Sequence, residues 1–482
     1  MRLNHILVFA LLLLVMPVVS CSKTAELDPQ LSVSPSSVSF PATGGTLAVG
    51  VTCNDDWKVT NSATWLQLDK SSGSNGSDSI HLTTKLNDTG AIRSAILSVD
   101  SENGQARRVS VSQACQIFPS YNTSPKAPDA TGMSSTAAQL IAKINLGINI
   151  GNTLELNQWH EPYPTLAYIQ LLKRTGFNAV RLPCGWYLQG GKNSTAKIPQ
   201  VWMDSVKKVV QWCVSNDMYV LLNIHWDGGW LEGDGNISAA KKDSVQARQK
   251  AYWEQIATAM RDFDEHLMFA SANEPFNVKD DAAAKILVSY HQACIDAVRS
   301  TGGHNTYRTI AIQGPDNYIQ PGVNFPTDPT PNRLVFEFHN YTPSSFTILS
   351  DDKINGGWDN VRFYWSVVNH STIEPDRNCS YGEETDLLKD YTRMKAQYID
   401  KGIPCIMGEY SAQRWSATNN KFVPKEMDKH NQSVDDWVKF NTKQCKAIGA
   451  APFYWETGGV LDRVANTIKD QRTIDAIVAG GK

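Results

Sequence analysis

The stretch Leu267-Met-Phe-Ala-Ser-Ala-Asn-Glu-Pro275 places a run of apolar residues directly before a polar Asn-Glu pair and a proline. A short apolar run bounded by turn residues is typical of a buried β-strand. Helical patterns flank it on both sides, over Asp243–Asp264 and Ala282–Ser300. A buried strand between two helices predicts an α/β fold with a parallel sheet, because parallel strands need crossover connections.

Seven further apolar runs of this kind alternate with helical patterns from residue 134 to the end of the chain. Eight strands that alternate with helices predict a (β/α)8 TIM barrel with extended loops. A doubly wound sheet would need a glycine-rich phosphate turn, and neither GxGxxG nor GxxxxGK occurs. The other expected strands are Ile144–Asn152, Ala179–Pro183, Tyr219–His225, Thr309–Gln313, Leu334–His339, Pro404–Glu409 and Ala451–Trp455, and further expected helices are Val201–Ser215, Asp390–Lys401 and Ser433–Ile448.

Six of the expected strands end in polar or reactive side chains. In a closed barrel the carboxyl ends of all strands face one mouth, so we expect these side chains to converge. Each of them alone has a structural interpretation, such as a core histidine or a helix-capping glutamate. Six strands that all end in such side chains at the same mouth indicate an active site. They are Arg181 on the second strand, His225 on the third, Asn273 and Glu274 on the fourth, His339 and Tyr341 on the sixth, Glu409 on the seventh and Trp455 on the eighth.

Two carboxylates at one mouth, Glu274 and Glu409, suit the cleavage of a glycosidic bond. A retaining glycosidase uses one carboxylic acid as proton donor and a second carboxylate as nucleophile, about 5–5.5 Å apart. The surroundings must also separate the two pKa values. An asparagine beside the acid can bind the sugar 2-OH, a tyrosine and an arginine can orient the nucleophile, and a tryptophan can stack on a pyranose ring.

The chain from about residue 144 to 460 resembles glycoside hydrolase family five, a family of retaining barrel glycosidases. The resemblance is carried by seven pieces in order at barrel spacing. They are Asn145-Leu-Gly-Ile-Asn-Ile-Gly-Asn-Thr153, Gly176-Phe-Asn-Ala-Val-Arg-Leu-Pro183, Asn223-Ile-His225, Ala272-Asn-Glu-Pro275, His339-Asn-Tyr341, Gly408-Glu409 and Phe453-Tyr-Trp455.

This resemblance implies a role for each residue and no metal or organic cofactor. It implies an endo-acting enzyme for β-1,4-linked plant glucan, whether cellulose-like, mixed-linkage or xyloglucan, and mannan stays open. Two departures leave the exact glycan undecided: Trp226 replaces a second histidine, and Glu456-Thr457 replaces Asp-Asn after the eighth strand. The implied roles are general acid/base for Glu274, nucleophile for Glu409, contact with the 2-OH for Asn273, support of Glu409 for Arg181 and Tyr341, lining of the catalytic subsite for His225 and His339, and its floor for Trp455.

Tryptophans in the loops after the strands raise a second question. Loop tryptophans can stack on successive sugars of a long chain or pack in the protein interior, and the sequence leaves both interpretations open. The residues concerned are Trp159, Trp186, Trp226, Trp230, Trp358 and Trp365.

The amino terminus reads as an export signal. Ile6 to Met16 form an apolar run that is too short to span a bilayer, and Pro17-Val-Val-Ser-Cys21 follows. The small residues ending in Cys21 resemble a bacterial lipobox, in which the cysteine is acylated; an ordinary signal peptide is the alternative. We therefore expect a lipoprotein at the cell envelope or cell surface, with the outer membrane as its site, and residues 22–30 as a tether.

Residues 31–115 have a different sequence pattern from the rest of the chain: short runs of alternating apolar and polar residues are separated by turn-rich stretches. This pattern predicts a small β-sandwich. The segment resembles the Bacteroidetes-associated carbohydrate-binding often N-terminal (BACON) module. The match rests on Trp57, Trp65-Leu66, Asn87, Arg93 and Val111-Ser112-Gln113. Trp57 and Trp65 are expected in the core rather than as a sugar platform, and a spacer role stands beside glycan binding. Residues 116–133, rich in Pro, Ser, Thr and Asn, are expected to form a linker.

The bulk composition excludes some partners. The net charge of −3 without basic blocks gives no electrostatic basis for nucleic-acid binding. Eight cysteines besides Cys21 permit disulfides in an exported protein, but Cys184, Cys294 and Cys405 lie in apolar contexts and are expected as buried thiols. We expect a monomer that binds a polysaccharide or oligosaccharide.

Two other functions fit parts of this sequence pattern. A glycan-binding protein that has lost catalysis would also carry an anchor and a sandwich, but the intact pair of Glu274 and Glu409 counts against it. A metal-dependent hydrolase built on His225 and His339 would usually need an HxH pair on the first strand, and residues 144–152 contain no histidine.

Overall fold

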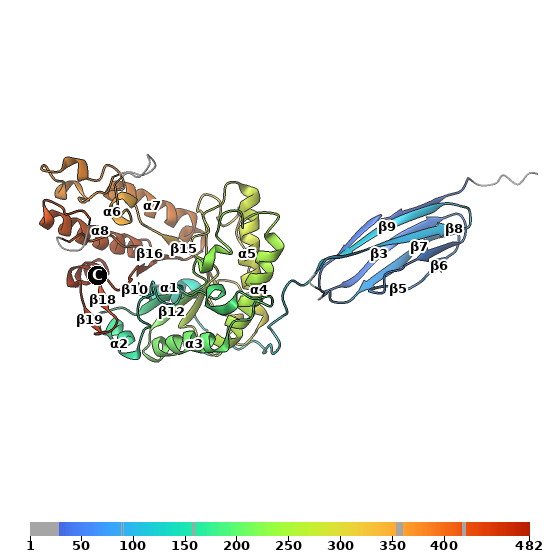
Figure 1. The fold of residues 1–482 in the computed structure, drawn as a ribbon, viewed down its shortest axis with the longest axis horizontal. Coiled ribbons are helices and arrows are strands. Elements are labelled where there is room, and N and C mark those ends of the chain that lie inside the picture. Colours follow the sequence, from blue (N-terminus) through green and yellow to red (C-terminus); the bar gives the residue numbers. More distant parts are fainter. Residues whose placement is uncertain (1–27, 88, 90, 157–159, 353–359, 417–420) are drawn as a thin grey trace, which may run out of the picture. The chain divides into compact units, whose positions relative to one another are not determined.

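The computed structural model describes residues 28–87, 89, 91–156, 160–352, 360–416 and 421–482. The chain divides into two compact units, the first ending at Gln116 and the second running from Ile117 to Lys482 (Figure 1). Cys21 and the rest of the expected export signal lie outside the described residues, as do Trp159 and Trp358. No helix within the described ranges is long and apolar enough to cross a bilayer.

The first unit is the predicted β-sandwich of two sheets. One sheet has four strands in the order β1-β3-β7-β5, and the other has five in the order β2-β9-β8-β4-β6. Strands β2 and β9 pair in parallel, and their neighbours pair antiparallel. The bounds are β1 Leu31–Ser34, β2 Ser37–Phe40, β3 Gly45–Cys53, β4 Trp57–Thr60, β5 Leu66–Leu68, β6 Ser72–Gly73, β7 Gly76–Thr84, β8 Arg93–Ser101 and β9 Ala106–Gln113.

The residues that carried the resemblance of this unit are structural. Trp57 is 1% exposed, in the core between the sheets. Trp65 packs against that core, and the Arg93 guanidinium lies 4.6 Å from the centre of its ring. Arg93 also donates to Gln113 Oε1 at 2.8 Å, and Asn87 Nδ2 donates to the carbonyl of Ala114 at 3.0 Å. Trp57 therefore offers no ring face to a sugar, and Arg93 covers one face of the partly buried Trp65 ring.

The second unit contains the predicted closed barrel of eight parallel strands, β10 to β17 in chain order. This confirms the (β/α)8 fold class. Figure 1 shows the barrel strands enclosed by helices. The strand bounds are β10 Gly147–Asn149, β11 Ala179–Leu182, β12 Tyr219–Asn223, β13 Leu267–Ala270, β14 Ile310–Gln313, β15 Leu334–His339, β16 Cys405–Glu409 and β17 Ala451–Tyr454, and a small hairpin of β18 (Leu461–Asp462) and β19 (Thr467–Ile468) follows.

Nine α-helices of the described chain surround or close the barrel. The first helix packs its apolar residues, among them Leu140 and Ile141, against inward-facing strand residues such as Leu221 and Val335, so it closes the amino-terminal end. Residues 314–333, between β14 and β15, form no helix. The helices are α1 Ala137–Lys143, α2 Leu166–Arg174, α3 Gln200–Ser215, α4 Lys242–Met260, α5 Asp281–Ser300, α6 Ser344–Thr347, α7 Glu384–Gln397, α8 Met427–Ala447 and α9 Gln471–Gly480.

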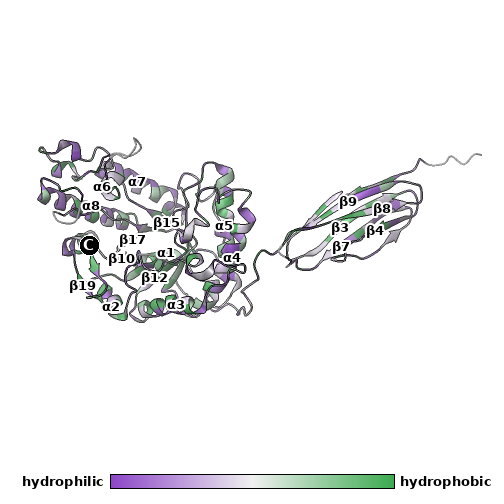
Figure 2. Cartoon of the chain, viewed as in Figure 1, coloured by the Kyte–Doolittle hydropathy of each residue, from purple (hydrophilic) through white to green (hydrophobic). Residues whose placement is uncertain are grey.

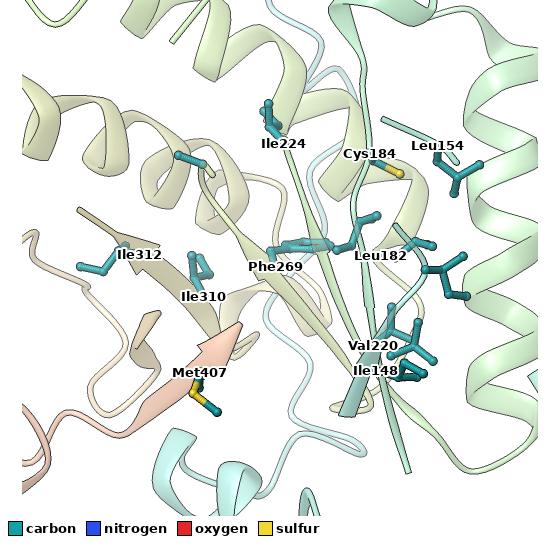
Figure 3. Close-up of a cluster of buried hydrophobic side chains, with 14 of the residues drawn as sticks. Ile148, Leu154, Leu182, Cys184, Val220, Ile224, Phe269, Ile310, Ile312 and Met407 are labelled. Atoms are coloured by element: carbon teal, nitrogen blue, oxygen red, sulfur yellow. The ribbon is translucent and has the colours of Figure 1, made fainter. Parts of the chain in front are cut away.

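The main core lies between the strands and the surrounding helices. Figure 3 shows part of it, including Ile148, Leu182, Val220 and Phe269 from four neighbouring strands. Figure 2 shows hydrophobic residues along the strands, whereas the helices mix hydrophobic and hydrophilic residues. On the barrel strands, the side chains that point outward into this core alternate with side chains that point inward, as the two-residue period of a strand requires. The inward positions at the carboxyl ends are thereby left free for polar side chains.

The segment predicted to be a linker, residues 116–133, belongs instead to the second unit from Ile117 onward. The backbone N–H of Tyr121 donates to Glu254 Oε2 at 2.6 Å, and Arg261 Nη1 donates to the carbonyl of Ser124 at 2.9 Å. Met133 is 1% exposed. The prediction was wrong here because a composition rich in Pro, Ser and Asn also fits a strap whose backbone is bound by side chains of the body it crosses.

The cysteines behave as small apolar residues. Cys184, Cys294 and Cys405 are fully buried thiols without disulfides, as expected from their apolar contexts. Cys213 and Cys445 are buried in the same way. Burial raises the pKa of the Cys213 thiol to about 12, so this residue stays protonated and unreactive at neutral pH.

Candidate active site

Arg181 forms the centre of the polar cluster at the carboxyl ends of the strands. Its side chain, on β11, is completely buried. Nη1 donates to Glu409 Oε1 at 2.8 Å, Nη2 donates to Asn273 Oδ1 at 2.7 Å, and Nε donates to Glu337 Oε1 at 2.8 Å. One planar guanidinium therefore fixes side chains from β15, from β16 and from the segment that follows β13 relative to one another.

Glu409 points into the barrel because β16 contains an irregularity. Pairing with β15 runs regularly to Met407 and then skips Gly408, so that His339 pairs with Glu409. Such a bulge re-aims the next side chain. A Cβ atom on Gly408 would lie 2.1 Å from Glu337 Oε1, so only glycine fits at this position. The second oxygen of Glu409 accepts a hydrogen bond from the Tyr341 hydroxyl at 2.8 Å.

Glu274 occupies the opposite side of the cluster. Its φ of +48° lies in the left-handed region, which is uncommon for a glutamate and is typical of functional positions. Its backbone N–H donates to Gln313 Oε1 at 2.7 Å, and its Oε1 lies 2.7 Å from His339 Nδ1. The side chain is 38% exposed, whereas that of Glu409 is 7% exposed. The more accessible carboxyl group is thus the one that can reach a departing sugar.

The separation of the two carboxyl groups decides between two hydrolytic mechanisms. One oxygen of Glu274, one oxygen of Glu409 and one nitrogen of His339 lie within 4.8 Å of one another. Retaining glycosidases hold their carboxyl groups about 5–5.5 Å apart, whereas inverting enzymes need roughly 6.5–9.5 Å to admit a water molecule. The observed geometry fits direct attack by a carboxylate on the anomeric carbon.

The same three side chains are the one set in the described part of the chain with the spacing of metal ligands. Arg181 already donates to Glu409, and His339 lies between the two glutamates. A guanidinium at 2.8 Å occupies the coordination sphere that a cation would need and repels it. The residues present therefore fit organic acid/base chemistry better than metal binding.

His339 lies between carboxylates on both sides of its ring. Nδ1 faces Glu274, and Nε2 lies 3.1 Å from Glu337 Oε1. Burial opposes the charged imidazolium, but Glu409, Glu274 and Glu337 outweigh it and raise the pKa of His339 to about 9. Burial raises the pKa of Glu274, yet His339 and Arg181 together bring it below its usual value. Glu274 and His339 therefore share one proton at neutral pH.

Glu337 is a site residue that our sequence reasoning missed. It is fully buried and accepts from Arg181 and His339 through Oε1, while Oε2 has no hydrogen-bond partner among the described residues. Burial raises the pKa of Glu337, but Arg181 and His339 lower it below its ordinary value. The signal was present in Leu334–His339, because Glu337 is two residues before His339 and shares its inward face.

His225 and Trp455 lie next to each other. Their rings are stacked, 5.6 Å apart and inclined by 9°. Asn223 Nδ2 lies 3.2 Å from His225 Nδ1, and Asn223 Oδ1 accepts from the Cys184 N–H, which leaves the proton of the neutral ring on Nε2. Burial, Arg181 and His339 hold the pKa of His225 well below its usual value. His225 is therefore a neutral donor beside a half-buried indole.

The tryptophans of the loops separate into two groups. Trp186, Trp230 and Trp365 are buried, which is the structural alternative left open above. Trp226 is 54% exposed directly after His225, with φ of +50°. Glu456, the other departure, is also structural, because it accepts from the N–H of Gly458 and pairs with Arg463 at 3.1 Å. Of these described loop tryptophans, Trp226 alone presents its ring to solvent.

Comparison with known proteins shows which families the two units of the chain match. A family model described as cellulase (glycosyl hydrolase family 5) matches residues 141–459, and one described as viral BACON domain matches residues 30–116. A xyloglucan-specific endo-β-1,4-glucanase of Bacteroides ovatus is 28% identical over 503 aligned positions, covering 98% of this chain and 96% of that protein.

Two solved structures extend the comparison. A Bacteroides ovatus GH5 xyloglucanase in complex with a XXXG heptasaccharide matches with a TM-score of 0.67 and 27% identity, covering 94% of this chain and 100% of that chain. A xyloglucan-specific β-1,4-glucanase from a ruminal metagenomic library, in complex with XXLG, matches with a TM-score of 0.64 and 31% identity, covering 72% of this chain and 96% of that chain.

Proposed function

The chain belongs to glycosyl hydrolase family 5 and is a retaining endo-β-1,4-glucanase, and we propose that its substrate is xyloglucan, with Glu274 as acid/base and Glu409 as nucleophile. The proposal of xyloglucan as substrate rests on relatives at 27–31% identity, whose names all specify xyloglucan. One of them matches over both units of this chain. Unbranched and mixed-linkage β-glucans are the alternatives.

The roles of the two glutamates follow from their surroundings. Glu409 is held on both oxygens by donors, Arg181 and Tyr341, which aims it at the anomeric carbon. Glu274 shares a proton with His339. A bound sugar chain covers the exposed part of Glu274, and this desolvation raises its pKa and draws the proton from His339. Glu274 then protonates the departing glycosidic oxygen while Glu409 forms the glycosyl–enzyme bond, and Glu274 later activates water to release the product.

Two alanine variants separate these roles. Glu409→Ala removes the nucleophile and should abolish activity on every substrate. Glu274→Ala should lower kcat on xyloglucan about 10²–10⁴-fold, the usual range for general acid catalysis. On an aryl glycoside with a good leaving group, Glu274→Ala should form the intermediate at a nearly normal rate, because this leaving group needs no proton. Glu102→Ala, at a side chain that is 61% exposed in the first unit, serves as control. Near-normal turnover by Glu409→Ala would refute the assignment.

The substrate is tested with a panel of polysaccharides. We expect kcat/KM on xyloglucan to exceed that on mixed-linkage β-glucan, carboxymethylcellulose and β-mannan by at least about tenfold, the discrimination that one or two well-filled sugar contacts supply. Reducing-end release and product sizing by chromatography measure both the rate and the endo pattern. Equal or higher kcat/KM on an unbranched glucan would refute the xyloglucan assignment and leave the enzyme class intact.

We also propose that the protein is a lipid-anchored monomer of the cell envelope. The lipobox-like ending at Cys21 supports the anchor. The monomer is supported by the site itself, since one chain supplies both glutamates and the side chains that hold them. Fatty-acid labelling of cells should mark the wild type and a Cys115→Ser control but not Cys21→Ser. Persistent label on Cys21→Ser, or a dimeric mass in light scattering, would contradict these two proposals respectively.

A further inference from the structure

Among the described residues, the backbone of Glu274 has one hydrogen bond from outside its own turn. Glu274 lies after the end of β13, with a left-handed φ of +48°. Residues other than glycine keep this conformation only where their surroundings hold it. The carbonyl of Glu274 accepts locally, from the Phe276 N–H at 2.8 Å. Its N–H donates at 2.7 Å to Oε1 of Gln313, on the neighbouring strand β14. Gln313 therefore connects the Glu274 backbone to the barrel.

The Gln313 side chain has no second hydrogen bond to any described residue. It is 1% exposed, and its Nε2 finds no acceptor in that part of the chain. The bond from Glu274 fixes which end of the amide is oxygen, because a flipped amide would oppose two donors. A buried, unused donor costs free energy that an apolar side chain would avoid. For stability alone an apolar residue would serve here, so the contribution of the glutamine is its bond to Glu274.

A buried histidine in turn holds the backbone of Gln313. His291, on α5, is fully buried, and burial lowers its pKa to about 4, so its ring is neutral and carries a single N–H. Nε2 lies 2.9 Å from the Gln313 carbonyl oxygen, which can only accept, so Nε2 holds this proton. Nδ1 accepts from the Ser271 hydroxyl at 2.6 Å. One ring therefore joins the ends of β13 and β14, from which Glu274 and Gln313 extend.

We propose that Gln313, anchored by His291, is the positioning residue of the acid/base, because it holds the backbone from which the Glu274 carboxyl group reaches the glycosidic oxygen. The inference rests on the proposed role of Glu274 and does not depend on which glucan is cleaved. Glu409 is held on both oxygens, whereas the Glu274 side chain is 38% exposed and has one partner among the described residues, His339. The position of the Glu274 carboxyl group therefore depends strongly on its backbone, and a displacement of about 1 Å can cost 10²-fold in rate.

The experiment removes the amide oxygen and keeps the length of the side chain. Gln313→Met deletes the acceptor of the Glu274 N–H together with the unused donor. Gln313 borders a cavity of about 320 Å³ along β15, which leaves room for the methyl group. Gln255→Met is the matched control. Gln255, on α4, is also buried, and its Oε1 accepts from the backbone N–H of Ile198 at 2.9 Å, but its Nε2 is used and donates to the carbonyl of Ala196 at 2.8 Å.

Two substrates separate the positioning of the acid from general damage. One is the polysaccharide that proves best in the panel above, and the other is an aryl glycoside whose good leaving group needs no proton. We expect Gln313→Met to lower kcat/KM about tenfold on the polysaccharide and to stay within twofold of wild type on the aryl glycoside. Gln255→Met should show the opposite pattern, with a lower Tm but kcat/KM within about twofold of wild type on both substrates, because its lost hydrogen bonds lie away from Glu274.

Three results would overturn the proposal: unchanged kcat/KM of a folded Gln313→Met on the polysaccharide, an equal loss on both substrates, or the same selective loss in Gln255→Met. If Gln313→Met does not fold, His291→Leu takes its place, because it removes the anchor of the Gln313 backbone. We then expect a loss of about threefold on the polysaccharide alone, and no selective loss overturns the proposal. The role of Glu274 is measured separately, since a Glu274→Ala variant that loses both substrates equally refutes the acid/base assignment instead.

Discussion

At the scale of single residues, the active site is a buried charge network rather than a pair of isolated glutamates. Arg181 and His339 connect three carboxylates, of Glu274, Glu337 and Glu409. Each buried charge is stabilised by at least one opposite charge within hydrogen-bonding distance, which offsets the cost of removing it from water. The position of one proton in this network, on His339 or on Glu274, determines whether the acid is ready.

Glu337→Gln should lower the pH at which the enzyme loses activity on the alkaline side of its pH profile. Glu337 is one of the carboxylates that raise the pKa of His339 to about 9, so its neutralisation should lower the pH at which the shared proton is lost. We expect the alkaline limb of kcat/KM on xyloglucan to move down by roughly one pH unit. Glu265→Gln, at the other end of the barrel beside Lys143, is the matched control. An unmoved limb in Glu337→Gln would mean that His339 does not supply this proton.

The same pKa has a consequence for stability with a definite sign. The folded state holds the His339 proton up to pH about 9, whereas an unfolded histidine loses it near its ordinary value of 6.5. The stabilising contribution is therefore complete below pH 6.5 and is lost as the pH rises through 9.

At the scale of elements, the bulge in β16 places the nucleophile. Gly408→Ala should lower the free energy of unfolding by at least about 2 kcal/mol, because the new methyl group meets the buried Glu337 carboxylate. The pairing of His339 with Glu409 depends on this bulge, so we also expect kcat to fall more than about tenfold as Glu409 is displaced. Gly459→Ala, with open space around its Cβ and no left-handed backbone conformation, is the control. Full activity of Gly408→Ala would show that the bulge is not needed.

The loop after β12 contains a second pH-sensitive carboxyl group, Glu232. Burial and Asp227 raise the pKa of Glu232 to about 8, although nearby backbone N–H groups oppose the shift. The folded state thus holds a proton between pH 4.5 and about 8 that the unfolded state has lost, so the free energy of unfolding falls as the pH rises through this window. Glu232→Gln cannot titrate. We expect Tm to fall less between pH 5 and pH 8.5 in this variant than in the wild type, and identical pH dependence would contradict the assignment.

At the scale of the whole molecule, the strap of residues 117–133 sets where the catalytic unit begins. A chain starting at Ile117 keeps the hydrogen bonds of Tyr121 to Glu254 and of Arg261 to Ser124, whereas a chain starting at Ser134 loses both together with buried Met133. We expect the longer chain to keep the Tm of the barrel and its activity on soluble xyloglucan. The shorter chain should melt at least about 5 °C lower. Equal melting temperatures would return residues 117–133 to the role of a linker.

Much of this protein was determined by its sequence. The alternation of apolar strands with helices follows from local periodicity, so the barrel, its eight strands and the β-sandwich were predictable. The first residues of the helices were less predictable. Helix α7 begins at Glu384 and α8 at Met427, each six residues before the predicted start, because polar first turns show no apolar periodicity. The reactive residues Arg181, Glu274, Tyr341 and Glu409 were found because strand ends of a barrel must converge.

Only the tertiary structure decided how these residues act on one another. The contact of Glu337 with Arg181 joins positions 156 residues apart, and no local pattern encodes such a distance. The bulge at Gly408 depends on the neighbouring strand. The pKa of His339 also depends on tertiary contacts, because carboxylates from other parts of the chain raise it against the effect of burial. The cavity along β15 likewise forms where the connection between β14 and β15, residues 314–333, contains no helix. Periodicity specifies which face of a strand is buried, whereas charge pairing and cavities depend on which strands and helices become neighbours.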